Sequence, residues 1–284
     1  MPTIRDAVAR ARDALTAAGI APAEASLDAD VLARHVLGWD RARMLSDSLG
    51  EPPESFAKAY GEVIERRSRR EPVSHITGHR EFWGLDFEVT PDVLTPRPET
   101  ELIVEEAIAW FSKSVAPRVM ADVGTGSGCL AVALALEFPS TFVLATDISG
   151  AALDVARRNA VRHGVNDRIA FLRTGFMPPP VPEVDLVVSN PPYIPRRDMA
   201  NLPPEVRDYE PAVALFGGEN GLEIYPRLFE EAKRQTARNG CLIVEVGYDQ
   251  GDAVTAIAEA GGWCVERVRH DLQGIARALV LRRP

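Results

Sequence analysis

Residues 184–194 read Val-Asp-Leu-Val-Val-Ser-Asn-Pro-Pro-Tyr-Ile, an apolar run that ends at a polar pair and two prolines. The β-branched part is typical of a buried strand in a parallel sheet. Because proline lacks a backbone N–H and cannot extend a strand ladder, the chain must leave the sheet at Pro191. We therefore expect Asn190 at the carboxyl end of a central strand, where open α/β sheets bind ligands. The alternative is an ordinary strand and turn, in which the Asn190 side chain binds its own backbone.

Around this stretch, short apolar runs alternate with segments of helical periodicity. This pattern predicts a mostly parallel sheet with helices on both faces. Residues 269–275 leave room only for a turn, so the last strand should run antiparallel to its neighbour. The expected strands lie near residues 119–123, 142–147, 168–172, 184–189, 241–246, 263–268 and 276–281, and the expected helices at 128–137, 150–163, 222–237 and 251–260.

The N-terminal 75 residues have a different character and read as helices. Thr3 with Asp6 three residues later is a variant of the capping box, which predicts a helix start. The basic cluster at 66–70 is expected to be a solvated helix end that favours the helix macrodipole. No set of catalytic residue types stands out, so we expect a small helical bundle that docks a substrate.

Residues 80–94 alternate in polarity around Gly84, which predicts a β-hairpin between two domains. The expected organisation is a helical docking domain at 1–75, a hairpin linker at 76–97 and an α/β domain at 98–284. Residues 191–221 form a long, Pro-rich connection, which in a compact domain suggests a functional lid.

Composition excludes several classes of protein. The chain has 284 residues, of which 46% are hydrophobic and 26% charged, as in an ordinary globular protein. The polar N-terminus does not resemble a signal peptide, and no run approaches the roughly 18 apolar residues of a membrane span. Three scattered cysteines suit neither a disulfide framework nor a zinc site. We expect a cytoplasmic protein without a membrane partner.

The charge balance makes a nucleic-acid partner unlikely by composition. Residues 1–75 carry 11 Lys/Arg against 12 Asp/Glu, so nearly all of the net charge of −9 falls on the rest of the chain. Binding to a phosphate backbone requires clustered cations, which an acidic domain does not offer overall.

A glycine loop at residues 122–128, Asp-Val-Gly-Thr-Gly-Ser-Gly, follows a short apolar strand and begins a helix. Glycines there let a ligand approach the backbone and its free N–H groups. Such a loop serves both dinucleotides and S-adenosylmethionine, and its Gly-x-Gly-x-Gly spacing favours the latter. Asp147, at the end of the next strand, can accept hydrogen bonds from both ribose hydroxyls of either cofactor. The alternative for Asp147 is a helix cap.

Several segments together resemble the peptide chain release factor glutamine N5-methyltransferases (the PrmC/HemK family). The resemblance covers residues 75–284 well and residues 1–74 by architecture only. It implies a seven-stranded, Rossmann-like class I methyltransferase sheet, with an N-terminal helical bundle joined by a β-hairpin. The matching segments are His75-Ile76-Thr77-Gly78, Glu81-Phe82-Trp83-Gly84, Thr95-Pro96-Arg97-Pro98-Glu99-Thr100-Glu101, Asp122–Gly128, Asn190-Pro191-Pro192-Tyr193, Gly217-Gly218-Glu219-Asn220-Gly221-Leu222 and Glu245-Val246-Gly247.

The resemblance also implies the partners and the donor site. The methyl acceptor would be the glutamine of the Gly-Gly-Gln motif in class-one release factors, and the methyl donor S-adenosylmethionine. The donor would be held by Gly124, Thr125, Gly126, Ser127, Gly128 and Asp147, with Asn190 bordering both donor and acceptor. The family's acidic-aromatic pair falls at Thr174-Gly175, so Gly175 borders the donor without a side chain. We hypothesise that Phe176 supplies the stacking ring instead.

The Asn-Pro-Pro-Tyr segment suggests how an amide nitrogen, which is a poor nucleophile, could react. Asn190 Oδ1 and the carbonyl of Pro191 could each accept one hydrogen of the substrate NH₂, while the prolines stiffen the backbone. Tyr193 would pack on the planar acceptor. Arg97 and Thr100 could line the acceptor entrance, or could simply form a packed helix start. No metal is required.

Three other functions remain open from the sequence. Glutamine methylation of a ribosomal protein would use the same chemistry. Methylation of an exocyclic amine in nucleic acid, such as adenine N6, could use Asn-Pro-Pro-Tyr on a flipped base. A docking module that has lost its donor is suggested by Thr174-Gly175 and disfavoured by the complete glycine loop.

Overall fold

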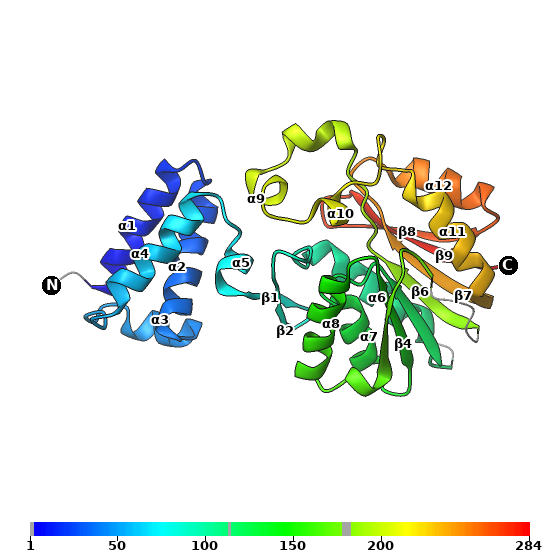
Figure 1. The fold of residues 1–284 in the computed structure, drawn as a ribbon, viewed down its shortest axis with the longest axis horizontal. Coiled ribbons are helices and arrows are strands. Elements are labelled where there is room, and N and C mark those ends of the chain that lie inside the picture. The colour runs from blue at the N-terminus through cyan, green and yellow to red at the C-terminus, as the bar shows by residue number, and fades with distance from the viewer. Residues whose placement is uncertain (1–2, 113–114, 178–182) are drawn as a thin grey trace. The chain divides into compact units, whose positions relative to one another are not determined.

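A computed structural model of the chain describes residues 3–112, 115–177 and 183–284 (Figure 1). The chain forms two compact units. The first comprises Met1–Gly78 together with Pro203–Tyr209, and the second His79–Leu202 together with Glu210–Pro284. The connection after Tyr193 therefore contributes a short segment to the helical unit, whereas the sequence placed all of that connection in the α/β domain.

The first unit is a bundle of short helices around an apolar core. Thr3 and Asp6 form the predicted capping box, with Asp6 N donating to Thr3 Oγ1 and Thr3 N to Asp6 Oδ2. Within the core, the buried Tyr60 hydroxyl donates to the Ala29 carbonyl at 2.8 Å. The helices are α1 (Ile4–Ala17), α2 (Pro22–Leu37), α3 (Arg41–Asp47), α4 (Phe56–Ser68), α5 (Val73–Thr77) and α9 (Pro204–Arg207).

The expectation of a solvated basic cluster at 66–70 is wrong for Arg67. Its side chain is only 2% exposed and forms ion pairs with Asp28 at 2.7 Å, Glu24 at 2.7 Å and Glu205 at 3.0 Å. A buried guanidinium must be paired to offset its lost hydration. Three carboxylates from α2 and α9 supply that pairing, which no local pattern around residue 67 could reveal.

The predicted hairpin is present and belongs to the second unit. Strand β1 (His79–Phe82) pairs antiparallel with β2 (Leu85–Glu88) across a two-residue turn, where Trp83 and Gly84 have φ of 55° and 70°. Phe82 is buried in the core of the α/β unit. The hairpin thus packs as part of that unit.

The central sheet has seven strands in the order β5-β4-β3-β6-β7-β9-β8. This confirms the predicted α/β fold with a seven-stranded class I methyltransferase sheet. The last strand runs antiparallel to both neighbours, as expected from the short turn before it. The strands are β3 (Val119–Val123), β4 (Phe142–Asp147), β5 (Ile169–Arg173), β6 (Val184–Ser189), β7 (Thr236–Glu245), β8 (Cys264–His270) and β9 (Ala276–Arg282).

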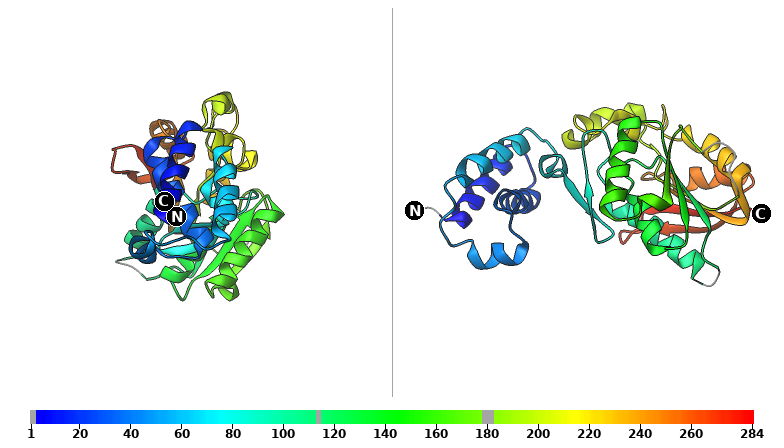
Figure 2. Two further views of the ribbon diagram at one scale, coloured as in Figure 1. Left: turned by 90° about the vertical axis from the view of Figure 1, so that its left-hand side faces the viewer. Right: turned by 60° about the horizontal axis from the view of Figure 1, so that its bottom comes forward.

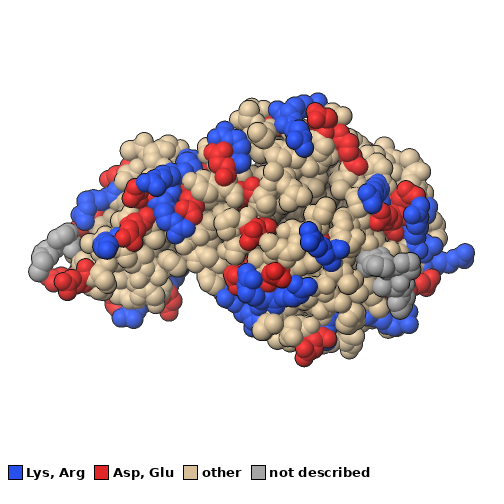
Figure 3. Space-filling view, viewed as in Figure 1, with Lys and Arg blue, Asp and Glu red and all other residues tan. Residues whose placement is uncertain are grey.

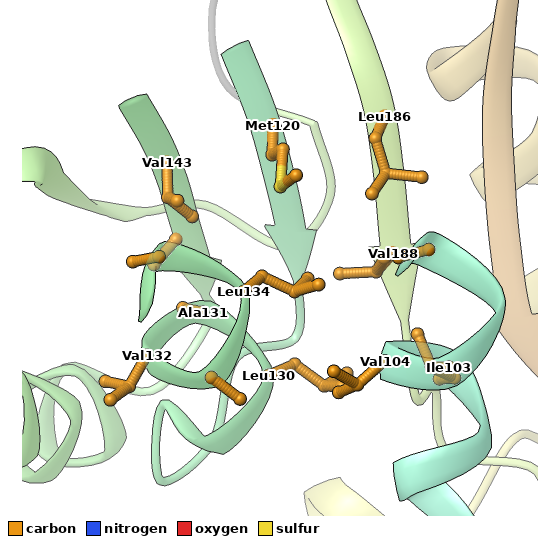
Figure 4. Close-up of a cluster of buried hydrophobic side chains, with 14 of the residues drawn as sticks. Ile103, Val104, Met120, Leu130, Ala131, Val132, Leu134, Val143, Leu186 and Val188 are labelled. Carbon is orange, nitrogen blue, oxygen red and sulfur yellow. The ribbon is translucent and has the colours of Figure 1, made fainter. Parts of the chain in front are cut away.

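Helices cover both faces of this sheet (Figures 1 and 2). One face packs against α6 (Glu101–Phe111), α7 (Cys129–Glu137) and α8 (Gly150–Arg162), and the other against α11 (Ile224–Gln235) and α12 (Gly251–Ala260). Figure 4 shows strand residues such as Met120 and Val188 facing Leu130 and Leu134 of α7. This arrangement leaves the carboxyl ends of β3, β4 and β6 to the connecting loops. None of the helices within the described ranges is long and apolar enough to cross a membrane.

Candidate active site

A cavity of about 340 Å³ lies at the carboxyl ends of β3, β4 and β6, entirely within the α/β unit. Three parts of the chain singled out from the sequence line it: the glycine loop, Asp147 and Asn190. Because these residues end neighbouring parallel strands, the sheet order brings them together. The strand-and-turn alternative for Asn190, in which its side chain serves only its own backbone, is wrong.

The glycine loop is shaped by its own backbone. Gly124, Gly126 and Gly128 have φ of 77°, 54° and 81°, a region that favours glycine. The N–H groups of Gly124 and Thr125 both donate to the Thr146 carbonyl, at 2.9 and 2.8 Å. A Cβ added at Gly124 or Gly126 would meet no heavy atom within 4 Å, so the space beside the loop is open.

The two hydroxyl residues of the loop, Thr125 and Ser127, are buried. Thr125 is buried and donates to Asp122 Oδ2 at 2.6 Å, and the N–H of Ala131 donates to the same oxygen at 3.1 Å. Burial raises the pKa of Asp122 to about 7. Ser127 is buried as well. Both residues line the cavity while their side chains are largely turned into the protein.

Asp147 faces the cavity with its carboxylate partly engaged. Its Oδ2 accepts from Gly126 N at 2.9 Å and its Oδ1 from Ser149 N at 2.8 Å. The helix-cap alternative for Asp147 is wrong, because Ser149 caps α8 by accepting from Ala152 N. Each carboxylate oxygen can accept more than one hydrogen bond, so both retain capacity for a ligand.

Asn190 is held by a buried chain of hydrogen bonds. Its Nδ2 donates to Thr100 Oγ1 at 3.0 Å, and Thr100 Oγ1 donates to Glu245 Oε2 at 2.6 Å. The other Glu245 oxygen accepts from the Tyr193 hydroxyl at 3.1 Å. Thr100 and Glu245 are each 2% exposed. Since Nδ2 is engaged, Oδ1 is the atom of Asn190 left to accept a hydrogen from a ligand.

Burial raises the pKa of Glu245 to about 7, although the hydrogen bonds from Thr100 and Tyr193 act in the opposite direction. The structure places Glu245 two hydrogen bonds away from the Asn190 side chain.

Only some of the residues that were predicted to contact the methyl acceptor line the cavity. Arg97 and Pro192 line it, and Arg97 pairs with Glu210 at 2.5 Å. Thr100 lines it too, but its hydroxyl already serves Asn190 and Glu245. Pro191 is buried, and neither Pro191 nor Tyr193 is among the lining residues.

The end of the cavity beside β5 is formed by Gly175, Phe176 and Ile148. A Cβ at Gly175 would be 3.8 Å from Ile148 Cδ1, so these positions face each other. Phe176 is half-buried, with the Arg227 guanidinium 4.2 Å from the centroid of its ring. Ile148 was not singled out from the sequence, although an apolar residue directly after Asp147 was a usable signal.

On the face drawn in Figure 3, acidic groups lie among the Lys and Arg groups.

Comparisons with known proteins show the family to which the chain belongs. Residues 6–78 match the PrmC N-terminal domain, and residues 102–202 match the methyltransferase small domain. The release factor glutamine methyltransferase of Cereibacter sphaeroides is 43% identical over 282 residues, covering 98% of each chain. That of Geobacter sulfurreducens is 40% identical, covering 98% of this chain and 95% of the relative.

A solved structure shares the fold. The N-terminal domain of human METTL16, in complex with SAH, has a TM-score of 0.50 and 16% identity, covering 70% of this chain and 76% of that one. The fold and these matches define an S-adenosylmethionine-dependent methyltransferase. The chain belongs to the release factor glutamine methyltransferase family.

Proposed function

We propose that this enzyme methylates the side-chain amide nitrogen (N5) of the glutamine in the Gly-Gly-Gln motif of class-one peptide chain release factors, in the cytoplasm. The observation that carries the proposal is the fixed orientation of Asn190. Thr100 accepts from its Nδ2, which leaves Oδ1 to accept from a substrate amide beside the glycine loop. The family membership of the chain points to the same acceptor.

The donor fits the residues of the cavity. Gly124, Thr125, Gly126 and Ser127 line the cavity, with open space beside Gly124 and Gly126, and Asp147 offers acceptor capacity for the ribose hydroxyls. Gly128 does not line the cavity, because it packs against Ala156. Asp147 would hold the ribose at the end of β4, and Gly175 and Phe176, which follow β5, would border the adenine. When bound, the donor supplies a sulfonium-activated methyl group.

The acceptor amide is held by two oxygens of the Asn-Pro-Pro-Tyr segment. Asn190 Oδ1 accepts one hydrogen of the substrate NH₂. The carbonyl of Pro191 accepts the other, since Pro191, although itself buried, lies between the lining residues Asn190 and Pro192. Within the described part of the chain, that carbonyl has no other hydrogen-bond partner. Holding both hydrogens aims the nitrogen at the methyl group and stabilises the positive charge that develops on it. One N–H proton then leaves to solvent.

The remaining site residues surround this amide. Pro192 and Arg97 border the acceptor side of the cavity, and Thr100 positions Asn190. The predicted packing of Tyr193 on the acceptor stays a prediction, since its hydroxyl is bound to Glu245. The helical domain at 1–75 is proposed to dock the release factor, and the hairpin segment 76–97 to connect it to the methyltransferase domain at 98–284.

A transfer experiment tests the substrate. The enzyme is incubated with methyl-labelled S-adenosylmethionine and either a release factor, ribosomal proteins or DNA. We expect label on the release factor only, on the glutamine of Gly-Gly-Gln, and none on a release factor with that glutamine replaced by alanine. Label on a ribosomal protein or on adenine N6 instead would replace the proposal with one of its alternatives.

A further inference from the structure

Gln250 binds the backbone of the Asn-Pro-Pro-Tyr segment from outside the cavity. Its Nε2 donates to the Tyr193 carbonyl at 2.9 Å, and its Oε1 accepts from Gly247 N at 3.2 Å. The carboxamide therefore spans from the loop after β7 to the segment after β6. Gln250 does not line the cavity, and both ends of its carboxamide are already bound to backbone.

Two glycines lie against the same backbone. A Cβ at Gly217 would be 2.4 Å from the Pro192 carbonyl oxygen, and one at Gly221 would be 2.1 Å from the Tyr193 carbonyl oxygen. Real Cβ atoms do not approach backbone that closely, so only glycine fits there without displacing the segment. Gly221 also has a φ of 75°, which is a second reason for glycine at this position.

Backbone hydrogen bonds join the two segments further. Ile194 N donates to the Leu215 carbonyl at 2.9 Å, and Gly217 N donates to the Ile194 carbonyl at 3.1 Å. The carbonyls of Pro192 and Tyr193 are thus both directed at protein atoms, whereas the Pro191 carbonyl is left without a partner in the described residues.

We propose that Gln250 is a positioning residue, which acts with Gly217 and Gly221 to orient the Asn-Pro-Pro-Tyr backbone so that the Pro191 carbonyl faces the acceptor amide. This device acts on the backbone of the segment, whereas the Thr100–Glu245 pair orients the Asn190 side chain and Glu245 also binds the Tyr193 hydroxyl. The inference rests on the proposed function. A misplacement of about 1 Å at a reacting amide can cost about 100-fold in rate, so a backbone hydrogen bond at this place matters for turnover.

Two substitutions of Gln250 distinguish its two hydrogen bonds. Gln250→Glu keeps an oxygen that accepts from Gly247 N but has no N–H to donate to the Tyr193 carbonyl. Gln250→Ala removes both interactions. Gln273→Ala, in an exposed turn, is the matched control. The readouts are kcat and KM with a release factor as substrate, the Kd for S-adenosylmethionine and the thermal midpoint.

We expect Gln250→Glu and Gln250→Ala to lower kcat about ten- to a hundredfold, with the donor Kd within about twofold of wild type. Both variants should bind donor and melt cooperatively, which shows that they fold. A wild-type kcat for Gln250→Glu would overturn the inference, as would a loss that appears only in donor affinity. If the wild-type enzyme itself transfers no methyl group to the release factor, the proposed function fails, and the inference fails with it.

Discussion

The Asn190 side chain donates from Nδ2 to the hydroxyl of Thr100 at 3.0 Å, and this single bond decides which atom of the amide faces the cavity. Thr100 can accept from Asn190 because its own proton goes to the buried Glu245. The bond from Thr100 to Glu245 thus fixes the direction of the bond from Asn190 to Thr100. Above its pKa of about 7 the buried Glu245 carboxylate can only accept hydrogen bonds, and it thereby sets the orientation of the Asn190 amide two hydrogen bonds away.

Thr100→Val tests this orientation, because it replaces the hydroxyl with a methyl group of similar volume. We expect kcat to fall by about ten- to a hundredfold while the donor Kd stays nearly unchanged. Glu245 also loses a partner, which should cost about 1–3 kcal/mol of the free energy of unfolding. Thr100→Ser keeps the hydroxyl and should retain most of the activity. Equal kcat for Thr100→Val and wild type would show that Asn190 is oriented by something else.

Glu245 should make the stability of the protein depend on pH. Its pKa is 4.5 when unperturbed and about 7 in the folded protein. Between these values the folded state holds a proton that the unfolded state has released, so the free energy of unfolding falls as pH rises through that range. Asp122, with a folded pKa of about 7, acts in the same direction.

The variant Glu245→Gln isolates this contribution. We expect the decline in unfolding free energy between about pH 4.5 and 7 to become shallower, by up to about 1.4 kcal/mol per pH unit. Denaturant unfolding at several pH values measures it. Glu259→Gln, on the exposed side of α12, should leave the slope as in wild type. An unchanged slope in Glu245→Gln would mean that its carboxyl does not titrate in this range.

Phe176→Ala tests whether this ring contributes to donor binding where Gly175 has no side chain. We expect the donor Kd to rise by about tenfold, the loss of one aromatic contact of roughly 1.4 kcal/mol, with little change in kcat at saturating donor. Calorimetry with S-adenosylhomocysteine measures the affinity. Phe142→Ala, at a 42% exposed position away from the cavity, is the control. Wild-type affinity in Phe176→Ala would exclude the ring from the donor site.

A further prediction concerns the contribution of the buried Arg67 to the stability of the helical unit. Arg67→Ala leaves Asp28 and Glu205 without their buried partner, so we expect a loss of about 3–5 kcal/mol in the free energy of unfolding. Arg69→Ala removes an exposed ion pair with Glu65 and should cost about 0.5 kcal/mol or less. Similar losses from the two variants would show that the Arg67 pairs contribute no more than a surface salt bridge.

The order of strands and crossover helices could be predicted from the sequence, because each strand carries a local apolar pattern and each helix its own period. The ends of β3, β4 and β6 could be placed for the same reason, which located the glycine loop, Asp147 and Asn190. The short helices α3 and α5 were missed, since seven and five residues carry too little periodicity.

The interactions that tune the site could not be predicted, because they join residues distant in sequence. Thr100 and Asn190 are 90 positions apart, and Gln250 and Tyr193 are 57 apart. Neither pair has a local signal, and each depends on how loops from different strands meet. The burial of Arg67 is of the same kind, since one of its partners, Glu205, is 138 positions away.

The most direct test of the account is methyl transfer by Asn190→Ala, followed by mass spectrometry of the Gly-Gly-Gln glutamine in a release factor. Asn166→Ala is the matched control, because the Asn166 side chain donates to the neighbouring exposed residue Asp167. We predict that Asn190→Ala binds S-adenosylmethionine measurably but leaves the glutamine unmodified, whereas wild type and Asn166→Ala add one methyl group. A methylated glutamine at the wild-type rate in Asn190→Ala would contradict the central role of Asn190.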